Sequence, residues 1–539
     1  MRYTSHSPSS RKLEHHCRGC FPPQLASSAY HFKPFWVQLC YFLVVSFAGY
    51  LALKLLKPRS AYEPGDFDLF FTSVSAAAVS SMSTVEMEVF SNAQLIIITL
   101  LMFLGGEVYM SFLGLLIQRF KLLSAQDRRQ ENLPEVDSMH TNSQTWPAIK
   151  SEEQAIDLGT INHPPGPSDR DEPLTDKPFS NDQEMKLHYN SIKTLGYVVL
   201  GYFLVIHVVG SGLISAYIDL TPSAKTVLKN KGLVLHTFSI FTTVSTFTNC
   251  GFLPTNENMM VFRKNLGLQL ILIPQILLGN TLYAPCLRLV IHVLERLTRK
   301  TEYKYILNNY QELGYDHLMS KKRSWYLFGT VLVLLISQFV AFVAMEWNSG
   351  VMDGMNALEK LVGSLFQCVN SRHTGESIVD LSSVSSAILV LFIVMMYLPP
   401  YASFLPIGYQ QEEASENKGG MKKEKKNTIV ENIMLSPLTC LAIFVFAICI
   451  TERKSLKEDP LNFNVLNIVV EVISAYGNVG FSTGYSCKRR LKLDEICEDK
   501  WFGFAGRWSN AGKVVLILVM FFGRLKKFSM HGGKAWTLT

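Results

Sequence analysis

Long apolar runs separated by polar segments dominate the sequence. A helix needs about 20 apolar residues to cross the hydrocarbon core of a bilayer. Eight runs approach or exceed this length, and an even number places both ends of the chain on the same side. The runs lie at roughly 35–56, 93–118, 192–217, 265–294, 325–346, 383–408, 432–450 and 511–524. The pattern predicts an all-α polytopic membrane protein with eight transmembrane helices.

A shorter apolar segment lies between the two runs of each successive pair. It contains about a dozen apolar and small hydroxylic residues, too few to span a bilayer, and it runs into turn-like residues. A re-entrant half-helix fits this pattern, because non-helical backbone at membrane depth is tolerated only where it is buried in protein or lines water. The four segments are 67–79, 233–249, 357–373 and 465–478.

The four short segments align with one another. Phe71-Thr-Ser-Val-Ser in the first is repeated as Phe241-Thr-Thr-Val-Ser in the second. In this frame one position is occupied by Ser81, Gly251, Gly375 and Gly480. The residues that flank it are Val79, Ser80, Asn249, Cys250, His373, Thr374, Asn478 and Val479. The alignment predicts four tandem units, each made of a helix, a half-helix with its pore loop, and a second helix.

Polar linkers join the predicted units. The first, 119–190, is rich in Asp, Glu, Pro and Ser and is predicted to be a disordered loop. The second, 296–323, is basic, and the third, 409–430, is rich in Lys. The units themselves are 35–118, 191–295, 324–408 and 431–527, with tails at 1–34 and 528–539.

Composition agrees with a membrane protein and excludes a soluble enzyme. Hydrophobic residues make up 48% of the chain and charged residues 18%, against about 25% charged in soluble proteins. The net charge of +7 is not gathered on one basic face, so nucleic acid is not an expected partner. Basic residues collect in the linkers and tails, and the positive-inside rule therefore predicts that both termini are cytoplasmic.

Four similar re-entrant loops predict a pseudo-fourfold assembly around one central pore. Rings of backbone carbonyls can replace the hydration shell of an ion, and glycine allows the backbone to approach the ion closely. The sequence shows no ring of four carboxylates, which a divalent ion would favour. The expected cargo is a monovalent cation, held by the backbone carbonyls of the filter.

Several motifs resemble the Trk/Ktr/HKT superfamily of potassium and sodium transporters, and within it the plant high-affinity potassium transporter type. The resemblance covers nearly the whole chain after residue 30. The motifs are Val79-Ser-Ser-Met-Ser-Thr-Val-Glu-Met-Glu88, Leu104-Gly-Gly-Glu107, Thr248-Asn-Cys-Gly-Phe252, Asn370-Ser-Arg-His-Thr-Gly-Glu376, Gly477-Asn-Val-Gly-Phe-Ser-Thr-Gly484 and Gly523-Arg-Leu-Lys-Lys527.

The resemblance implies that the four aligned positions form an ion-selectivity filter. It also implies that Ser81, in place of glycine, marks the sodium-preferring subfamily. A Cβ and a hydroxyl in one quadrant would narrow and distort the ring, which penalises the larger ion. We therefore expect passive, channel-like uniport of sodium across the plasma membrane, with no cofactor and with the lipid bilayer as surroundings. Relatives associate as dimers, and we expect a homodimer here.

Two other functions stay open at this stage. One is a potassium transporter, or a sodium–potassium symporter, on the same scaffold. The other, from a different class, is a proton-coupled carrier of an organic solute, which inverted repeats and a large central cavity would favour. An enzyme is not expected, since the sequence shows neither a Walker-type loop nor a convincing pair of nucleophile and base.

Residues on the cytoplasmic side of the filter are candidates for a barrier and a gate. Arg524 ends the last run. The resemblance implies a fixed positive charge beneath the filter, whereas snorkelling to the interface is the simpler alternative. Pro399 and Pro400 interrupt the sixth run and should break its helix. In relatives a broken segment here forms an intramembrane gate, while a plain kink is the alternative.

Three carboxylates call for an interpretation. Glu86 and Glu88 follow the first filter position on its outer side, where they could concentrate cations at the mouth or simply be solvated. Glu107 lies inside the second apolar run, and an intramembrane carboxylate suggests a function. Pairing of Glu107 with a basic side chain at the helix end is the simpler interpretation.

The cysteines suggest little chemistry. A cluster in the basic N-terminal tail lacks the folded spacer of a closed zinc site, so we do not expect a metal there. Its members are His15, His16, Cys17 and Cys20. Cys487 and Cys497 fall together in the outer loop before the last run, so a local disulfide is possible.

Overall fold

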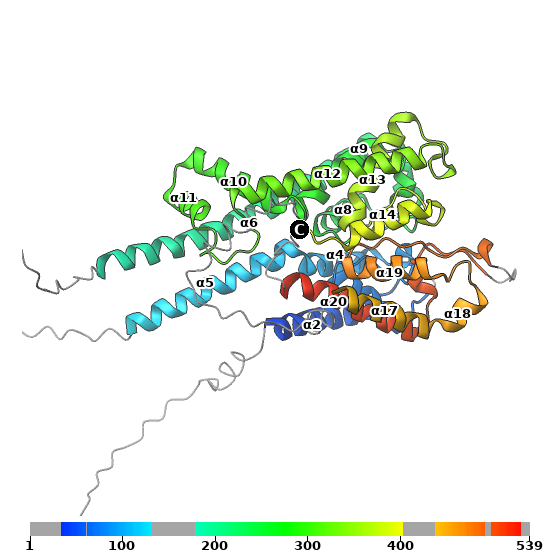
Figure 1. Cartoon of the computed structure of the whole chain (residues 1–539), viewed down its shortest axis with the longest axis horizontal. Helices are drawn as coiled ribbons and strands as arrows, with labels where there is room; N and C mark the ends of the chain where they lie inside the picture. Colours follow the sequence, from blue (N-terminus) through cyan, green and yellow to red (C-terminus); the bar gives the residue numbers. More distant parts are fainter. Residues whose placement is uncertain (1–33, 61, 132–177, 403–436, 491–496, 530–539) are drawn as a thin grey trace, which may run out of the picture.

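The computed structural model describes residues 34–60, 62–131, 178–402, 437–490 and 497–529. Within these ranges the regular secondary structure is helical and contains no strand (Figure 1). The predicted all-α class is therefore confirmed. The Lys-rich linker 409–430 and the tail cluster around Cys17 lie outside the described residues.

The helices follow the order of the predicted units. The first unit holds α2 (Pro34–Leu55), α3 (Asp66–Ala77), α4 (Asn92–Gly105) and α5 (Glu107–Glu131). The second holds α6 (Pro178–Leu220), α7 (Pro222–Asn230), α8 (Leu235–Thr248), α9 (Leu266–Gly279) and α10 (Tyr283–Thr298), followed by α11 (Thr301–Asn308). The third holds α12 (Lys321–Glu346), α13 (Ala357–His373) and α14 (Ser386–Tyr397). The fourth holds α17 (Pro437–Thr451), α18 (Arg453–Glu458), α19 (Val465–Gly477) and α20 (Asn510–Ser529).

Short 3-10 turns punctuate the outer loops. They are η2 (Met87–Val89), η3 (Asn258–Phe262), η4 (Gly350–Met352), η5 (Leu381–Ser383), η7 (Cys487–Arg489) and η8 (Phe504–Arg507). Each turn lies between a half-helix and a neighbouring helix of its unit.

All four segments predicted as half-helices are helices, namely α3, α8, α13 and α19. Their starts are set by local chemistry. Asn356 and Glu359 form a capping box at the start of α13, and the Asn464 side chain accepts a hydrogen bond from the Asn467 backbone N–H at the start of α19. Their ends are set by left-handed residues, because Asn249 and Asn478 terminate α8 and α19 at positive φ.

The helices pack in a closed order. Within each unit the half-helix contacts both flanking helices: α3 contacts α2 and α4, α8 contacts α6 and α9, α13 contacts α12 and α14, and α19 contacts α17 and α20. Between units, the second flanking helix packs on the half-helix of the next unit. These pairs are α4 on α8, α9 on α13, α14 on α19 and finally α20 on α3. The last unit thus closes on the first.

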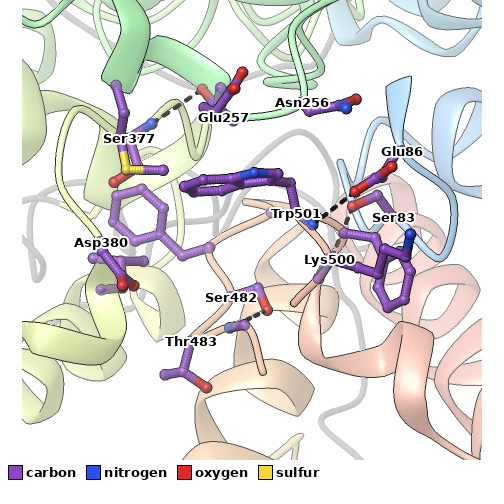
Figure 2. A pocket seen from close by; sticks show the side chains of 18 of the residues that line it. Ser83, Glu86, Asn256, Glu257, Ser377, Asp380, Ser482, Thr483, Lys500 and Trp501 are labelled. Atoms are coloured by element: carbon purple, nitrogen blue, oxygen red, sulfur yellow. Dashed lines mark hydrogen bonds between the residues drawn. The ribbon is translucent and has the colours of Figure 1, made fainter. Parts of the chain in front are cut away.

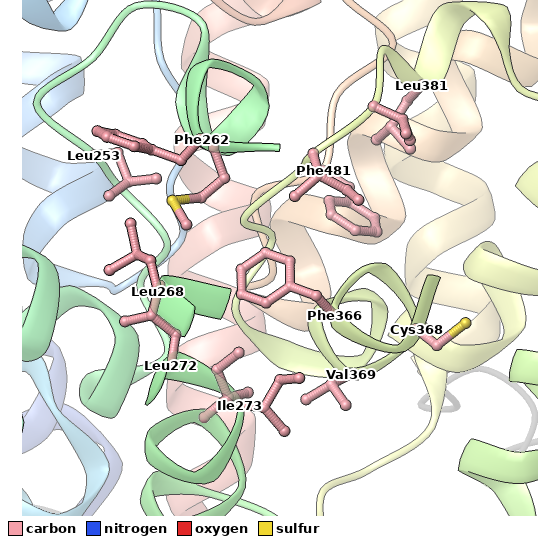
Figure 3. Packing of buried hydrophobic residues seen from close by; sticks show 14 of the residues in the cluster. Leu253, Phe262, Leu268, Leu272, Ile273, Phe366, Cys368, Val369, Leu381 and Phe481 are labelled. Atoms are coloured by element: carbon pink, nitrogen blue, oxygen red, sulfur yellow. The ribbon is translucent and has the colours of Figure 1, made fainter. Parts of the chain in front are cut away.

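Apolar side chains fill the seams between units. At the seam of the second, third and fourth units, Phe366 of α13 is fully buried in a cluster with Leu272 of α9 and Phe481, which follows α19 (Figure 3). The C-terminal part of each half-helix is buried, which favours apolar and small residues there.

The eight predicted spans are only partly matched by length and composition. Among the described residues, Trp36–Leu55, Glu184–Leu220 and Lys321–Glu346 are each long and apolar enough to cross a membrane. Two bent pairs, α4 with α5 and α9 with α10, raise the number to five if each pair is one span. The apolar helices α14 and α17 are shorter. The protein is membrane-embedded, and the full eight-span layout stays a prediction.

Two runs predicted as single helices are broken. The chain bends by 57° between α4 and α5 and by 85° between α9 and α10. Gly106 leaves the helical region at the first break, and Gly279 ends α9 at the second. Glycine is a poor helix former, so a pair such as Gly105-Gly106 is a natural place for a kink. A hydropathy profile does not reveal these breaks, because the residues on both sides of each break are apolar.

The prediction of a disordered loop over residues 119–190 is wrong at both ends of that range. Helix α5 continues to Glu131, and α6 begins at Pro178, so both helices extend beyond the rest of the bundle (Figure 1). The segment after Lys121 is rich in Leu, Ala, Gln, Arg and Glu, which are strong helix formers that need no membrane. Residues 132–177 lie outside the described part of the chain.

Candidate ion-selectivity filter

The chain leaves three half-helices by the same backbone turn. A left-handed residue is followed two positions later by a second one. The pairs are Val79 (φ 50°) and Ser81 (52°), Asn249 (59°) and Gly251 (87°), and Asn478 (50°) and Gly480 (100°). In the third loop Gly375 has the corresponding φ of 74°. Positive φ explains the glycines, and it makes Val79 and Ser81 strained positions.

The four aligned positions contact one another around a ring. A Cβ placed on Gly251 would lie 1.6 Å from the Thr374 carbonyl oxygen, in the third loop. A Cβ on Gly375 would lie 2.1 Å from the Val479 carbonyl oxygen, in the fourth loop. No side chain fits at either position, since real Cβ atoms do not approach other atoms so closely.

The ring closes through the first loop. A Cβ on Gly480 would lie 2.2 Å from the Cβ of Ser81. The thiol of Cys250 in turn contacts the Ser81 backbone. The loops therefore follow one another in the order second, third, fourth, first and back to second, which is the order of the helix packing.

The flanking residues tie neighbouring loops together. The Thr374 hydroxyl donates a hydrogen bond of 2.9 Å to Asn249 Oδ1, and Asn478 Nδ2 donates one of 2.8 Å to Ser80 Oγ. The other predicted flanking side chains, Val79, Cys250, His373 and Val479, are buried around the ring. All twelve residues predicted for the filter and its flanks are thus brought together.

Further hydrogen bonds that hold the filter loops in place are not evident from the sequence. The Glu376 backbone N–H donates to Asn370 Oδ1 at 3.1 Å, and the Gly480 backbone N–H donates to Ser474 Oγ at 3.0 Å. The fully buried Glu376 carboxylate accepts a 2.6 Å hydrogen bond from the Thr246 hydroxyl of the second unit. The available signal was a carboxylate directly after a filter glycine, where burial requires a partner.

An open cavity of about 310 Å³ lies on the outer side of the ring. Ser81, Gly375 and Gly480 line it, and the carboxylates that face it are Glu86, Glu257, Asp380 and Asp499. Figure 2 shows the Trp501 indole lying across this mouth, and the Trp501 backbone N–H donates to Glu86 Oε1 at 3.1 Å. Glu86 therefore lies at the mouth, as the sequence predicted.

Glu88 does not share this position. It lies outside the described cavity lining and binds Lys231 Nζ at 2.6 Å, and Lys231 also binds Glu257 at 2.6 Å. Partial burial opposes the charge on Lys231, but hydrogen bonds to Glu257 and Glu88 outweigh it and raise the pKa of Lys231. Glu88 therefore belongs to an ion cluster at the joint between the first two units, next to Glu257 of the cavity lining, and its role at the mouth stays a prediction.

Arg524 is buried and does not snorkel to the interface. Its side chain is 2% exposed, its guanidinium donates to the Gly105 carbonyl oxygen at the break between α4 and α5, and it lies 6.0 Å from the Phe42 ring centre. Its charge interacts with Glu107 and with Cys250 of the second filter loop. Glu107 Oε1 also lies 3.9 Å from His317 Nδ1, and the pairing of Glu107 with a basic side chain at the helix end stays a prediction.

The two prolines interrupt the sixth run as predicted. Helix α14 ends at Tyr397, and Leu398 is extended (φ −65°, ψ 133°). Pro399 and Pro400 both offer their carbonyl oxygens to Arg372 Nη2, at 2.9 and 3.5 Å. A proline has no N–H to continue the helix, which explains the stop.

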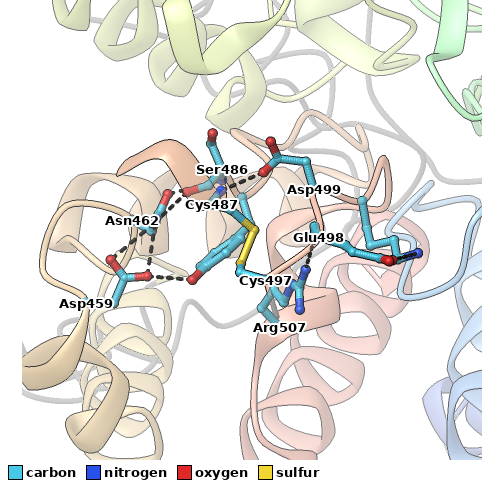
Figure 4. Close-up of a disulfide and its surroundings, with 10 residues drawn as sticks. Asp459, Asn462, Ser486, Cys487, Cys497, Glu498, Asp499 and Arg507 are labelled. Atoms are coloured by element: carbon cyan, nitrogen blue, oxygen red, sulfur yellow. Dashed lines mark hydrogen bonds and ion pairs between the residues drawn. A yellow bond between two sulfur atoms is a disulfide. The ribbon is translucent and has the colours of Figure 1, made fainter. Parts of the chain in front are cut away.

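Cys487 and Cys497 form a disulfide in the outer loop between α19 and α20 (Figure 4). The Cys487 backbone N–H donates to Asp499 Oδ1 at 2.6 Å, and the Arg507 guanidinium donates to the Glu498 carbonyl oxygen at 2.5 Å. The loop closed by this disulfide places Lys500 and Trp501 in the lining of the cavity.

A ring of four loops inside a bundle of membrane helices is typical of a membrane transport protein. The comparisons with known proteins name the class. The model of the family TrkH, "Cation transport protein", matches residues 173–531. The chain belongs to this family of cation transporters.

Individual relatives cover most of the chain. "Cation transporter HKT1;3" of Oryza sativa subsp. japonica is 48% identical over 513 residues, which is 94% of this chain and 92% of that protein. "Sodium transporter HKT1" of Arabidopsis thaliana is 50% identical over 488 residues, 90% and 92% of the two chains. The "Crystal Structure of the Potassium Transporter TrkH from Vibrio parahaemolyticus" aligns with a TM-score of 0.48 at 12% identity, over 93% of this chain and 85% of that one.

Proposed function

We propose that this cation transporter conducts sodium passively, as a channel-like uniport, through the ring formed by Ser81, Gly251, Gly375 and Gly480. The observation that carries the proposal is the closed order of contacts between the four loops. Left-handed backbone at equivalent positions gives the loops a shared path, along which carbonyl groups can replace the water around an ion. The ion binds these carbonyls, and no cofactor takes part.

The preference for sodium rests on Ser81. Its side chain packs against Gly480 of the next loop, so one quadrant of the ring carries a Cβ and a hydroxyl that the other three lack. This asymmetry should disfavour the larger potassium ion. The name of the Arabidopsis relative, a sodium transporter at 50% identity, supports the same choice.

The proposed location is the plasma membrane, with both termini in the cytoplasm and a homodimer as the assembled form. Basic linkers and tails favour the cytoplasmic side for the termini. The disulfide of the mouth loop favours an oxidising, extracellular side for the cavity.

Two-electrode voltage clamp of oocytes that express the chain tests the proposal. External sodium and potassium are varied independently, and water-injected oocytes provide the background. We expect the reversal potential to move by about 59 mV for each tenfold change in sodium. A reversal potential that follows potassium or the proton gradient would reject sodium uniport.

A further inference from the structure

Trp501 lies at the outer face of the ring, where residues of all four units meet. It belongs to the loop before α20, in the fourth unit, and its backbone N–H donates to Glu86 Oε1 of the first unit at 3.1 Å. The indole lies across the mouth (Figure 2), and Glu257 of the second unit and Asp380 of the third line the same cavity. Ser81, Gly375 and Gly480 of the ring line it as well. One aromatic side chain therefore lies over the space that leads to the ring.

The indole also lies on the border between two cavities. A second open cavity, of about 650 Å³, lies beside the mouth, and residues of the second and third units, such as Val261 and Gly350, line it. The residues that line both cavities are Glu257, Met260, Val379, Asp380 and Trp501. Of these five, Trp501 alone comes from the fourth unit. Removal of the indole would therefore join the two spaces into a wider opening above the ring.

The backbone that carries the indole is fixed by the filter loops. The Gly503 N–H donates to Ser83 Oγ at 3.1 Å, and the Phe504 N–H donates to Ser482 Oγ at 2.7 Å. Both serines lie two residues after a ring position, one in the first loop and one in the fourth. The disulfide closes the other end of the same loop. These contacts hold the base of the Trp501 side chain in place above the ring, although the residue is 53% exposed.

We propose that Trp501 is a specificity-determining residue that acts as a size-selecting cover over the outer mouth. This inference rests on the proposed sodium conduction and adds a restriction on which cations reach the ring. A small alkali ion passes beside the indole through the open cavity. A bulky organic cation, such as a tetraalkylammonium ion, is attracted by the carboxylates of the mouth, but the indole keeps it away from the ring.

Block of sodium current by external tetraethylammonium tests the cover, because this ion is a monovalent cation far larger than sodium. We expect Trp501→Ala to lower the half-blocking concentration about tenfold, which corresponds to the burial of roughly 60 Å² of apolar surface in the widened mouth. Trp501→Phe keeps a smaller ring and should give an intermediate value. The reversal potential with sodium and potassium present should stay unchanged in both variants, because the contacts between the filter loops do not involve the indole.

Trp325→Ala is the matched control and should show wild-type block, because Trp325 is 66% exposed on α12 and lies outside the lining of both cavities. An unchanged half-blocking concentration in Trp501→Ala overturns the cover. A raised one overturns it too, since the indole would then bind the organic cation instead of excluding it. If Trp501→Ala does not reach the surface, Trp501→Phe decides by the same criterion. Absence of sodium current in the wild type would reject the proposed function, whereas normal current with unaltered block rejects the cover alone.

Discussion

Three of the four ring positions cannot carry a side chain. The space beside Gly251 and Gly375 is filled by a carbonyl oxygen of the next loop, and both residues have positive φ. Ser81 also has positive φ, yet its Cβ is accommodated because it faces Gly480, which has none. The position of Ser81 is therefore the one ring position at which a side chain can be added without a clash between neighbouring loops.

Gly375→Ala should lower sodium current by at least about tenfold, because the added Cβ would displace the Val479 carbonyl oxygen from the ring. Gly329→Ala is the control, since a Cβ there meets nothing within 4 Å. Current is measured by voltage clamp and normalised to surface protein. Equal currents in the two variants would contradict a ring packed at this position.

The ring positions could be predicted from the sequence, and their cross-links could not. Internal repetition placed Ser81 and the three glycines in one frame, because each unit needs the same turn at the same distance from its half-helix. The hydrogen bonds of Thr374 to Asn249 and of Asn478 to Ser80 join residues 125 and 398 positions apart. Only the closed packing of the units brings these polar groups together.

At the scale of helices, the half-helices were the easiest elements to predict and the breaks the hardest. A dozen apolar residues followed by a turn has a distinct length, whereas the bend after α4 lies within a continuous apolar run. The breaks depend on side chains from other units, such as the donation from Arg524 to the Gly105 carbonyl oxygen, and these partners are not evident from a local pattern. The burial of Arg524 excludes snorkelling to the interface, whereas its role as a barrier to cations stays a prediction.

Arg524→Gln should raise inward sodium current about fivefold and weaken rectification. The variant removes a positive charge beside the second filter loop, and a barrier of about 1 kcal/mol is a reasonable electrostatic magnitude at this range. Arg524→Lys retains the charge and should keep the current low. Voltage-clamp currents normalised to surface protein provide the measurement. Wild-type current and rectification in Arg524→Gln would rule out a barrier at this residue.

At the scale of the molecule, the outer face has two groups of carboxylates with different tasks. Glu86, Asp380 and Asp499 face the open cavity, where their field can draw cations to the mouth. Glu88 shares Lys231 with Glu257 and joins the first unit to the second. The different environments of Glu86 and Glu88 could not be predicted from the sequence, because the two residues lie on one loop and differ only in the partners that they contact.

Glu86→Gln should lower sodium conductance about twofold at low ionic strength and have little effect at high salt, which screens exposed charges. Glu88→Gln should leave conductance unchanged and reduce stability by about 1 kcal/mol, since Lys231 loses one of its two carboxylates. Conductance at two salt concentrations and thermal unfolding in detergent measure the two effects. A loss of conductance in Glu88→Gln alone would reverse this assignment.

The most direct measurement is the reversal potential of Ser81→Gly against wild type with sodium and potassium both present. Removal of the Cβ and hydroxyl makes the four quadrants alike, so the reversal potential should move toward the potassium equilibrium potential. A variant that carries current at the wild-type reversal potential would show that Ser81 does not set the ion preference of the ring.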